Sequence, residues 1–150
     1  MVNKLKIVFL FIVFLISKVY SQLPIEIGQW RDHLPYNNCI SVCQGNKIIY
    51  GASKFCVFSY NKDDNSINRK NKINGLSDID ISTINYHKSL NILIIAYKNS
   101  NIDLIENDVV YNLSDIKRKL IPGNKSINKI ILIGDYAYIC CGFGIIVVDL

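Results

Sequence analysis

The chain of 150 residues contains no apolar run long enough to cross a membrane. Its most apolar stretch, residues 7–16, has ten residues, whereas a spanning helix needs about 20. Two lysines precede this stretch and two small residues, Val19 and Ser21, follow it, which is the layout of a secretory signal peptide. We therefore expect residues 1–21 to be a signal peptide and the mature chain to begin at Gln22 without a transmembrane segment.

The sequence also lacks a strongly basic region once the leader is removed. Three of its 17 basic residues lie in residues 1–21, which leaves 14 against 12 acidic residues, a net charge of +2. No stripe of Lys and Arg with interleaved aromatic residues remains, and we interpret the one cluster, residues 117–119, as a solvated loop or strand end. Nucleic acid is therefore not an expected partner.

Cysteine is present, but without a pattern that indicates metal binding or a disulfide framework. The number is odd for a fully paired exported chain: Cys39, Cys43, Cys56, Cys140 and Cys141. Cys39 and Cys43 would lie about 13 Å apart in an extended segment, too far for a bond, and neighbours on a strand point to opposite faces. There is no C-x-x-C pair, and neither His33 nor His87 lies in an H-x-x-x-H sequence. We expect free, largely buried thiols and no metal or cofactor.

Catalytic motifs are missing too, since the sequence contains neither G-x-S-x-G nor a paired-carboxylate motif. One segment invites a catalytic interpretation because His with Asp is a general-base pairing: Trp30, Arg31, Asp32, His33 and Tyr36. We favour a structural role, in which residues 22–39 dock on the following domain, bury Trp30 and Tyr36, and leave Arg31 and Asp32 to pair at the surface. His87 is expected to be solvated in a turn. We assign no catalytic, cofactor-binding or metal residue and expect no enzyme activity.

What the sequence does contain, from Ile40 onward, is the apolar alternation typical of β-strands. Three segments align with one another: ISVCQGNKIIYGASKFCVFSY from Ile40, INYHKSLNILIIAYKNSNIDLI from Ile84 and IILIGDYAYICCGFGIIVVDL from Ile130. In this alignment Tyr50, Ile95 and Ile139 are equivalent and lie 45 and 44 residues apart. Four antiparallel strands at this period are typical of a β-propeller blade. A β-sandwich is the alternative all-β fold, but it does not require the self-similarity.

The predicted fold is therefore all-β, a partial propeller of about two and a half to three blades at residues 40–78, 79–125 and 126–150. The GFG sequence at residues 142–144 is assigned to a hairpin and not to a phosphate loop, because no helical pattern follows it. The third blade lacks a fourth strand, so we expect a fragment of a longer protein or the product of a shortened reading frame. Its last strand would have an unpaired apolar edge, and we expect the chain alone to self-associate.

Four segments resemble the N-terminal propeller of the PorZ family, surface components of the type IX secretion system related to the propellers of two-component regulators. They are IGQWRDHLPYNN at residues 27–38, NGLSD at residues 74–78, LNILIIAYKNSNIDLI at residues 90–105 and the closing GFGIIVVDL. The resemblance implies a non-catalytic scaffold, exported to the periplasm or to the outer membrane surface. It also implies an attachment complex with the sortase PorU, to which the family is thought to deliver anionic lipopolysaccharide.

Three other functions stay open on the sequence. A periplasmic sensor propeller of a two-component regulator would be followed by a transmembrane helix and a kinase. A polysaccharide lyase or glycosidase would need His, Tyr, Arg or paired carboxylates on loops at the entrance of the ring, and the sequence does not offer them. A decayed product without activity is the third alternative.

Overall fold

The computed structural model describes residues 37–150. The predictions for the signal peptide, the start at Gln22, the side chains from Trp30 to Tyr36 and most of the docking segment fall outside these residues. Strands dominate the described part of the chain. Blade 1 consists of β1 (Ser41–Gln44), β2 (Ile48–Ala52), β3 (Cys56–Asn61) and β4 (Ile67–Asn71). Blade 2 consists of β5 (Ile81–His87), β6 (Ile92–Tyr97), β7 (Ile102–Glu106) and β8 (Val109–Leu113). Blade 3 consists of β9 (Ile127–Ile133), β10 (Tyr136–Cys141) and β11 (Gly144–Asp149). Two short helical turns follow blades 1 and 2, namely η1 (Lys72–Asn74) and α2 (Asp115–Arg118).

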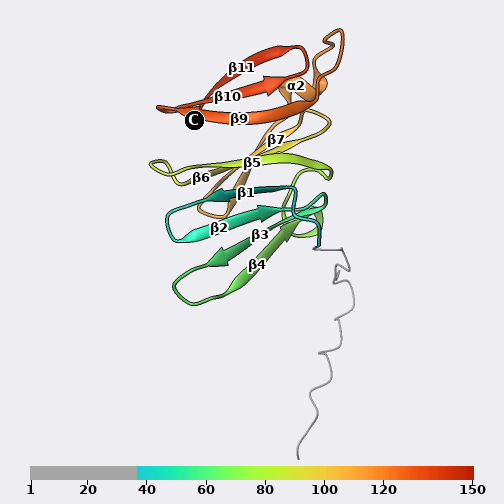
Figure 1. Cartoon of the computed structure of the whole chain (residues 1–150). Helices are drawn as coiled ribbons and strands as arrows, with labels where there is room; N and C mark the ends of the chain where they lie inside the picture. The colour runs from blue at the N-terminus through green and yellow to red at the C-terminus, as the bar shows by residue number, and fades with distance from the viewer. Residues whose placement is uncertain (1–36) are drawn as a thin grey trace, which may run out of the picture. The chain divides into compact units, whose positions relative to one another are not determined.

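Each sheet is antiparallel and keeps the order of the chain, so that consecutive strands form hairpins. The first strands of the three sheets are neighbours, since β5 lies against both β1 and β9. The sheets are therefore stacked face to face with their first strands together, as Figure 1 shows. This arrangement confirms the predicted partial β-propeller, with two four-stranded blades and one three-stranded blade among the described residues.

Hydrogen bonds between the blades repeat the sequence period in space. Asn46 Nδ2 donates to Asn91 Oδ1 over 2.9 Å, and Asn85 Nδ2 donates to the carbonyl of Ile130 over 3.0 Å. The partners are 45 residues apart in both cases. Side chains of a first strand and of the turn after it thus bond to the first strand or the first turn of the next blade.

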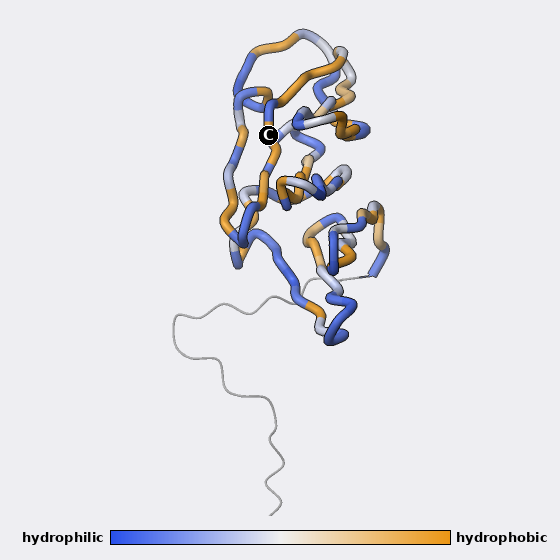
Figure 2. Tube along the Cα trace, turned by 90° about the vertical axis from the view of Figure 1, so that its left-hand side faces the viewer, coloured by the Kyte–Doolittle hydropathy of each residue, from blue (hydrophilic) through white to orange (hydrophobic). Residues whose placement is uncertain are grey.

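Two apolar layers hold the blades together. β6 is buried along its whole length because blade 2 lies between the other two blades. Its residues enter the two layers alternately, with Leu93 and Ile95 between blades 1 and 2 and Ile94 between blades 2 and 3. Ile94 and Ile95 have no exposed surface, and the burial of each contributes roughly 1.5–3 kcal/mol. Figure 2 shows the same pattern along the chain, where hydrophobic stretches are separated by hydrophilic turns.

The face on which each residue lies corrects one detail of the sequence alignment. Tyr50 of blade 1 packs against the layer between blades 1 and 2, which also contains Ile95 of the opposing blade. The corresponding forward-facing residue of blade 2 is Ile94, in the layer shared with Ile139 of blade 3. Tyr50 is therefore equivalent to Ile94, and its alignment with Ile95 is wrong by one residue. A one-residue error moves a side chain to the other face of a sheet, because the faces alternate with a period of two.

The hairpin turns follow from their sequences. Asn107 and Asp108 join β7 to β8 with positive φ angles of 47° and 69°, which a type I′ turn requires and which Asn and Asp tolerate. Cys141 and Gly144 pair across β10 and β11, and Gly144 has a φ of 144° that favours glycine. The GFG sequence therefore forms a hairpin, as the sequence predicts.

Candidate functional site

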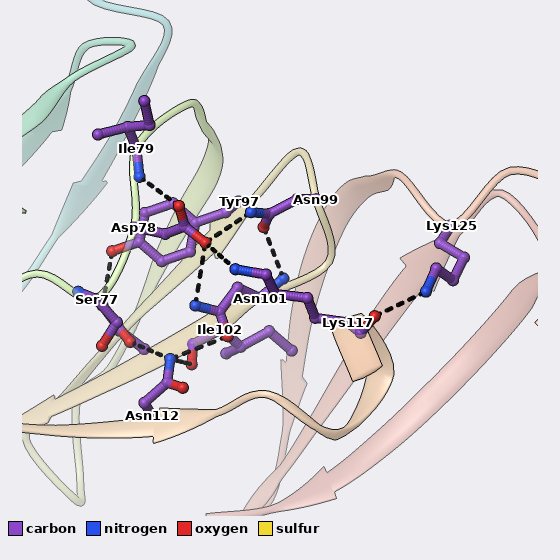
Figure 3. Close-up of polar contacts among 11 residues, drawn as sticks. Ser77, Asp78, Ile79, Tyr97, Asn99, Asn101, Ile102, Asn112, Lys117 and Lys125 are labelled. Carbon is purple, nitrogen blue, oxygen red and sulfur yellow. Dashed lines mark hydrogen bonds and ion pairs between the residues drawn. The ribbon is translucent and has the colours of Figure 1, made fainter. Parts of the chain in front are cut away.

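A cluster of polar side chains joins blade 2 to the segment that leads into blade 3 (Figure 3). We call it the Asp78 cluster, after the carboxylate that lies before β5 and is only 7% exposed. Asn99 of the turn between β6 and β7 donates to Asp78 Oδ2 over 2.6 Å, and Lys117 Nζ of α2 donates to the same oxygen over 2.6 Å. Asn101 Nδ2 lies 3.4 Å from it. Three segments distant in the sequence thus meet at one carboxylate.

The hydrogen bonds of this cluster keep Asp78 ionised. Burial opposes ionisation, but the bonds from Lys117, Asn99 and the Ile79 amide outweigh it and lower the pKa of the Asp78 carboxyl to about 2. The charge is therefore present at neutral pH and its oxygens are occupied by protein donors. A carboxylate held in this way acts as an anchor for the chain and is poorly suited to accept a proton from a substrate.

A second buried carboxylate, Asp103 of β7, lies next to the cluster and has no exposed surface. The Tyr97 hydroxyl donates to its Oδ2 over 2.6 Å, the Ser77 amide donates to the same oxygen over 2.9 Å, and Asn112 Nδ2 donates to Oδ1 over 2.8 Å. Burial, together with the neighbouring Asp103, raises the pKa of Tyr97 far above its ordinary value. The tyrosine thus stays protonated and donates to the carboxylate, which is a structural pairing.

The basic cluster at residues 117–119 differs in part from its predicted role. It belongs to a single turn of helix and its end, and Lys117 pairs with Asp78, whereas the Arg118 side chain is 72% exposed and pairs with Asp115. Lys125 closes this turn, because its Nζ donates to the carbonyls of Lys117 over 2.9 Å and of two neighbouring residues (Figure 3). The cluster is exposed, as predicted, but it lies on a helical turn instead of a loop or strand end, and Lys117 is held by its ion pair with Asp78.

A groove of about 710 Å³ opens between blades 1 and 2. Stacked rings of Tyr50 and Tyr86, with centroids 5.3 Å apart, form part of its wall. The lining also includes apolar residues, polar residues and one arginine: Ile48, Val57, Leu93, Ile105, Ser59, Asn68, Asn74, Asn91, Asn107 and Arg69. Lys70 of blade 1 forms an ion pair with Asp108 of blade 2 at the lining of the groove. The groove is a concave, mixed polar and apolar surface of the size that small ligands occupy.

The sequence prediction for His87 is wrong. The side chain is 7% exposed, its Nε2 lies 2.7 Å from the carbonyl of Gly134 in blade 3, and the Leu90 amide donates to its Nδ1 over 3.2 Å. Nδ1 therefore accepts and Nε2 donates, which fixes one neutral tautomer. His87 links blade 2 to blade 3 and is not a solvated turn residue.

All five cysteines are free, as the sequence predicts, but their burial is uneven. Cys56 and Cys141 are buried, Cys43 and Cys140 are half-buried, and Cys39 is exposed. Burial raises the pKa of the Cys43 thiol to about 12, so this thiol is protonated and unreactive at neutral pH. The expectation of largely buried thiols therefore fails for Cys39.

Two further observations concern the described residues alone. Among residues 37–150, no three side chains of His, Cys, Asp or Glu are grouped so that they could hold a metal ion. Within the same part of the chain, no helix has the length and apolar character needed to span a bilayer.

Comparison with known proteins identifies the family to which this propeller belongs. A family model described as "TSS9, PorZ, N-terminal beta-propeller domain" matches residues 49–150, more than half of the chain. The chain belongs to this family. A solved PorZ structure from Porphyromonas gingivalis is similar to it, with a TM-score of 0.70 and 27% sequence identity over 74% of this chain. The match covers 15% of that PorZ chain, which is described as an essential bacterial surface component of the type-IX secretion system. No curated protein matches the chain.

The sequence did not reveal two features of this PorZ-family propeller, namely the buried carboxylates Asp78 and Asp103 and the groove between blades 1 and 2. Asp78 and Asp103 lie in segments that carry the resemblance, NGLSD and LNILIIAYKNSNIDLI, but nothing in those letters indicates that the two carboxylates are neighbours. A charged residue inside the apolar β7 segment was the available signal, since buried charges are normally paired. To predict the groove from the sequence, one must know which faces of blades 1 and 2 meet. The one-residue error in the alignment obscured which residues lie on those faces.

Proposed function

We propose that the chain is a non-catalytic propeller scaffold of a type IX secretion attachment complex. The observation that carries the proposal is the family match over residues 49–150, together with a PorZ structure that has the same fold. The complete PorZ relative is a bacterial surface component, so we place this chain at the cell surface or in the periplasm. In this proposal the sortase PorU is a partner and anionic lipopolysaccharide is the material delivered to it.

The chemistry of the described residues supports a scaffold. Asp78 and Asp103, the buried carboxylates of the described part, are occupied by donors from the protein and join separate segments of the chain. Their hydrogen bonds rigidify the connections between blades, which suits a surface on which other proteins assemble. The role assigned to these residues is to hold the propeller together.

Deletion of the gene in its own bacterium tests the proposal. We expect secreted cargo to lose its attachment to the cell surface, and reintroduction of the gene to restore it. A tagged copy should also co-purify with the PorU-type sortase, whereas an equally tagged exported protein of unrelated fold should not. Unchanged cargo attachment in the deletion strain would contradict the proposal, and co-purification with a membrane kinase would favour the sensor propeller instead.

A further inference from the structure

The two ends of the stacked blades differ in charge. Because consecutive strands are antiparallel, the second turn of each blade lies at the same end as the connections between blades. This end, which we call the connection end, comprises residues 53–55, 72–80, 98–101, 114–126 and 142–143. The turns of the opposite end are residues 45–47, 62–66, 88–91, 107–108 and 134–135. The connection end has seven basic and three acidic residues, whereas the opposite turns have three basic and four acidic residues.

The positive charge of the connection end is only partly balanced. Its acidic residues each form an ion pair, namely Asp78–Lys117, Asp80–Lys54 and Asp115–Arg118. Lys125 Nζ is bound by backbone carbonyls. The other three lysines are exposed, and none of them forms an ion pair within residues 37–150: Lys72, Lys98 and Lys119. An acidic partner would therefore meet uncompensated cations at this end.

The same end exposes large apolar side chains. Leu120, which directly follows Lys119, is 97% exposed, and Ile73 and Ile79 are about half exposed. A single exposed apolar residue is ordinary on a protein surface. Several of them beside uncompensated lysines form the combination that protein interfaces use, in which apolar side chains are covered and charged groups surround them.

Residues 78–80 join these side chains into one surface. The Asp80 carbonyl accepts a hydrogen bond from the Lys98 amide over 2.8 Å, which places the turn between β6 and β7 against this segment. Asp78 binds Lys117 of α2 over 2.6 Å, and the Ile79 amide donates to Asp78 over 3.0 Å (Figure 3). Lys119 and Leu120 follow Lys117 at the end of α2. The lysines and the apolar side chains thus belong to adjacent segments that hydrogen bonds hold together.

We propose that the connection end docks a partner protein through an acidic segment that carries aliphatic side chains. Carboxylates of the partner would pair with Lys98 and Lys119, and its aliphatic side chains would cover Ile79 and Leu120. Charge complementarity favours an acidic partner, and the exposed apolar side chains favour a protein, since a polyanionic chain would leave them uncovered. The inference rests on the proposed scaffold role, because it names the surface through which the scaffold holds a partner.

Fluorescence anisotropy of the full chain with a labelled synthetic peptide tests the surface. The peptide contains leucines flanked by aspartates and glutamates, and we expect it to bind with an affinity that falls as salt is added. The variant K98E/K119E should lower this affinity by about tenfold or more, and Leu120→Ser by about threefold or more. K62E/K88E is the matched control, because it makes the same change in charge in the turns of the opposite end and should leave binding unchanged. All variants keep the outer face of blade 3, so self-association is common to every comparison.

Three results would overturn the proposal. They are a peptide that does not bind, equal losses for K98E/K119E and K62E/K88E, and equal binding of a peptide in which glycine replaces the leucines. Tighter binding of polygalacturonate, unaffected by Leu120→Ser, would assign the surface to a polyanion instead. If K98E/K119E does not fold, as judged by its far-ultraviolet spectrum, K98Q/K119Q provides the same comparison. Unchanged cargo attachment in the deletion strain would overturn the scaffold role and leave the peptide result as it is, so the two failures are distinguishable.

Discussion

At the scale of single residues, the Asp78 carboxylate stabilises the fold only while it is ionised. Its pKa of about 2 in the folded chain lies below the ordinary value of 3.8, so the stabilisation is present above pH 3.8 and is lost as the pH falls toward 2. We expect Asp78→Asn to lower the free energy of unfolding by about 1–2 kcal/mol at neutral pH and by much less near pH 2. Urea denaturation at the two pH values measures the difference.

Asp115→Asn is the matched control, because Asp115 forms an exposed ion pair with Arg118. Exposed pairs contribute little to stability, so this variant should unfold almost like the unmodified chain at both pH values. Equal losses for the two variants, or a loss for Asp78→Asn that persists at pH 2, would show that the Asp78 cluster does not act through its charge.

The buried Tyr97 hydroxyl provides a second test at this scale. Tyr97→Phe removes the donor that lies 2.6 Å from Asp103 Oδ2 and leaves a fully buried carboxylate with one partner fewer. We expect a loss of about 1–3 kcal/mol in the free energy of unfolding, measured by thermal or chemical denaturation. Tyr111→Phe, at a tyrosine that is 51% exposed, is the comparison, and a similar loss there would contradict the assigned role.

His87 shows why some residues could not be interpreted from sequence. The segment His87-Lys88-Ser89 consists of polar residues, which are typical of a solvent-exposed turn. The side chain is buried because a second blade, 47 residues further on, places the Gly134 carbonyl against it. A contact that depends on the stacking of two sheets leaves no signal in the five residues around the histidine.

At the scale of the element, the three sheets differ in how well their strands are covered. β6 has neighbours on both sides within its sheet and blades against both faces, whereas β8 is the outer strand of blade 2 and is largely exposed. We expect the amides of β6 to exchange with deuterium at least about tenfold more slowly than those of β8, because opening β6 requires disruption of both apolar layers. Hydrogen exchange with mass spectrometry measures this, and equal rates in β6 and β8 would contradict the stacked arrangement.

Most of the elements were predictable from the sequence. Alternating apolar residues and turn residues at regular spacing identified the hairpins, and the GFG sequence was assigned correctly because a β-branched segment, not a helical pattern, follows it. Which residues of each sheet face the next blade was harder to predict. The 45-residue spacing aligned Tyr50 with Ile95, but Ile94 is the true counterpart. The repeats are 45 and 44 residues apart, a difference of one residue. A shift of one residue moves a side chain to the opposite face of its strand.

At the scale of the whole described part, the face of blade 3 that points away from blade 2 is apolar and uncovered. Its exposed side chains are Ile131, Ile133, Tyr136, Ile145 and Val147, and the last two belong to the outer strand β11. An exposed, β-branched edge favours pairing between chains. We expect the mature chain expressed alone to self-associate, and I145K/V147K to shift it toward the monomer in analytical ultracentrifugation.

Val109→Lys is the control for that experiment, since Val109 is also exposed but lies at the start of β8 in blade 2. It adds charge without altering the uncovered face, so we expect association to continue. A mature chain that sediments as a monomer, or one whose association is unchanged by I145K/V147K, would contradict the role of this face.

The central claim is that the first strands of successive blades lie side by side, and one pair of hydroxyls tests it directly. Ser41 Oγ of β1 lies 3.4 Å from Thr83 Oγ1 of β5. A disulfide requires side chains at such close range, so the variant S41C/T83C should form a 41–83 bond under mild oxidation, seen by mass spectrometry of its peptides. The protonated Cys43 thiol nearby should not compete, and the two single variants control for that. The stacked propeller predicts a 41–83 link that is nearly complete; a chain that stays unlinked, or links at other positions while both new thiols are reactive, would contradict it.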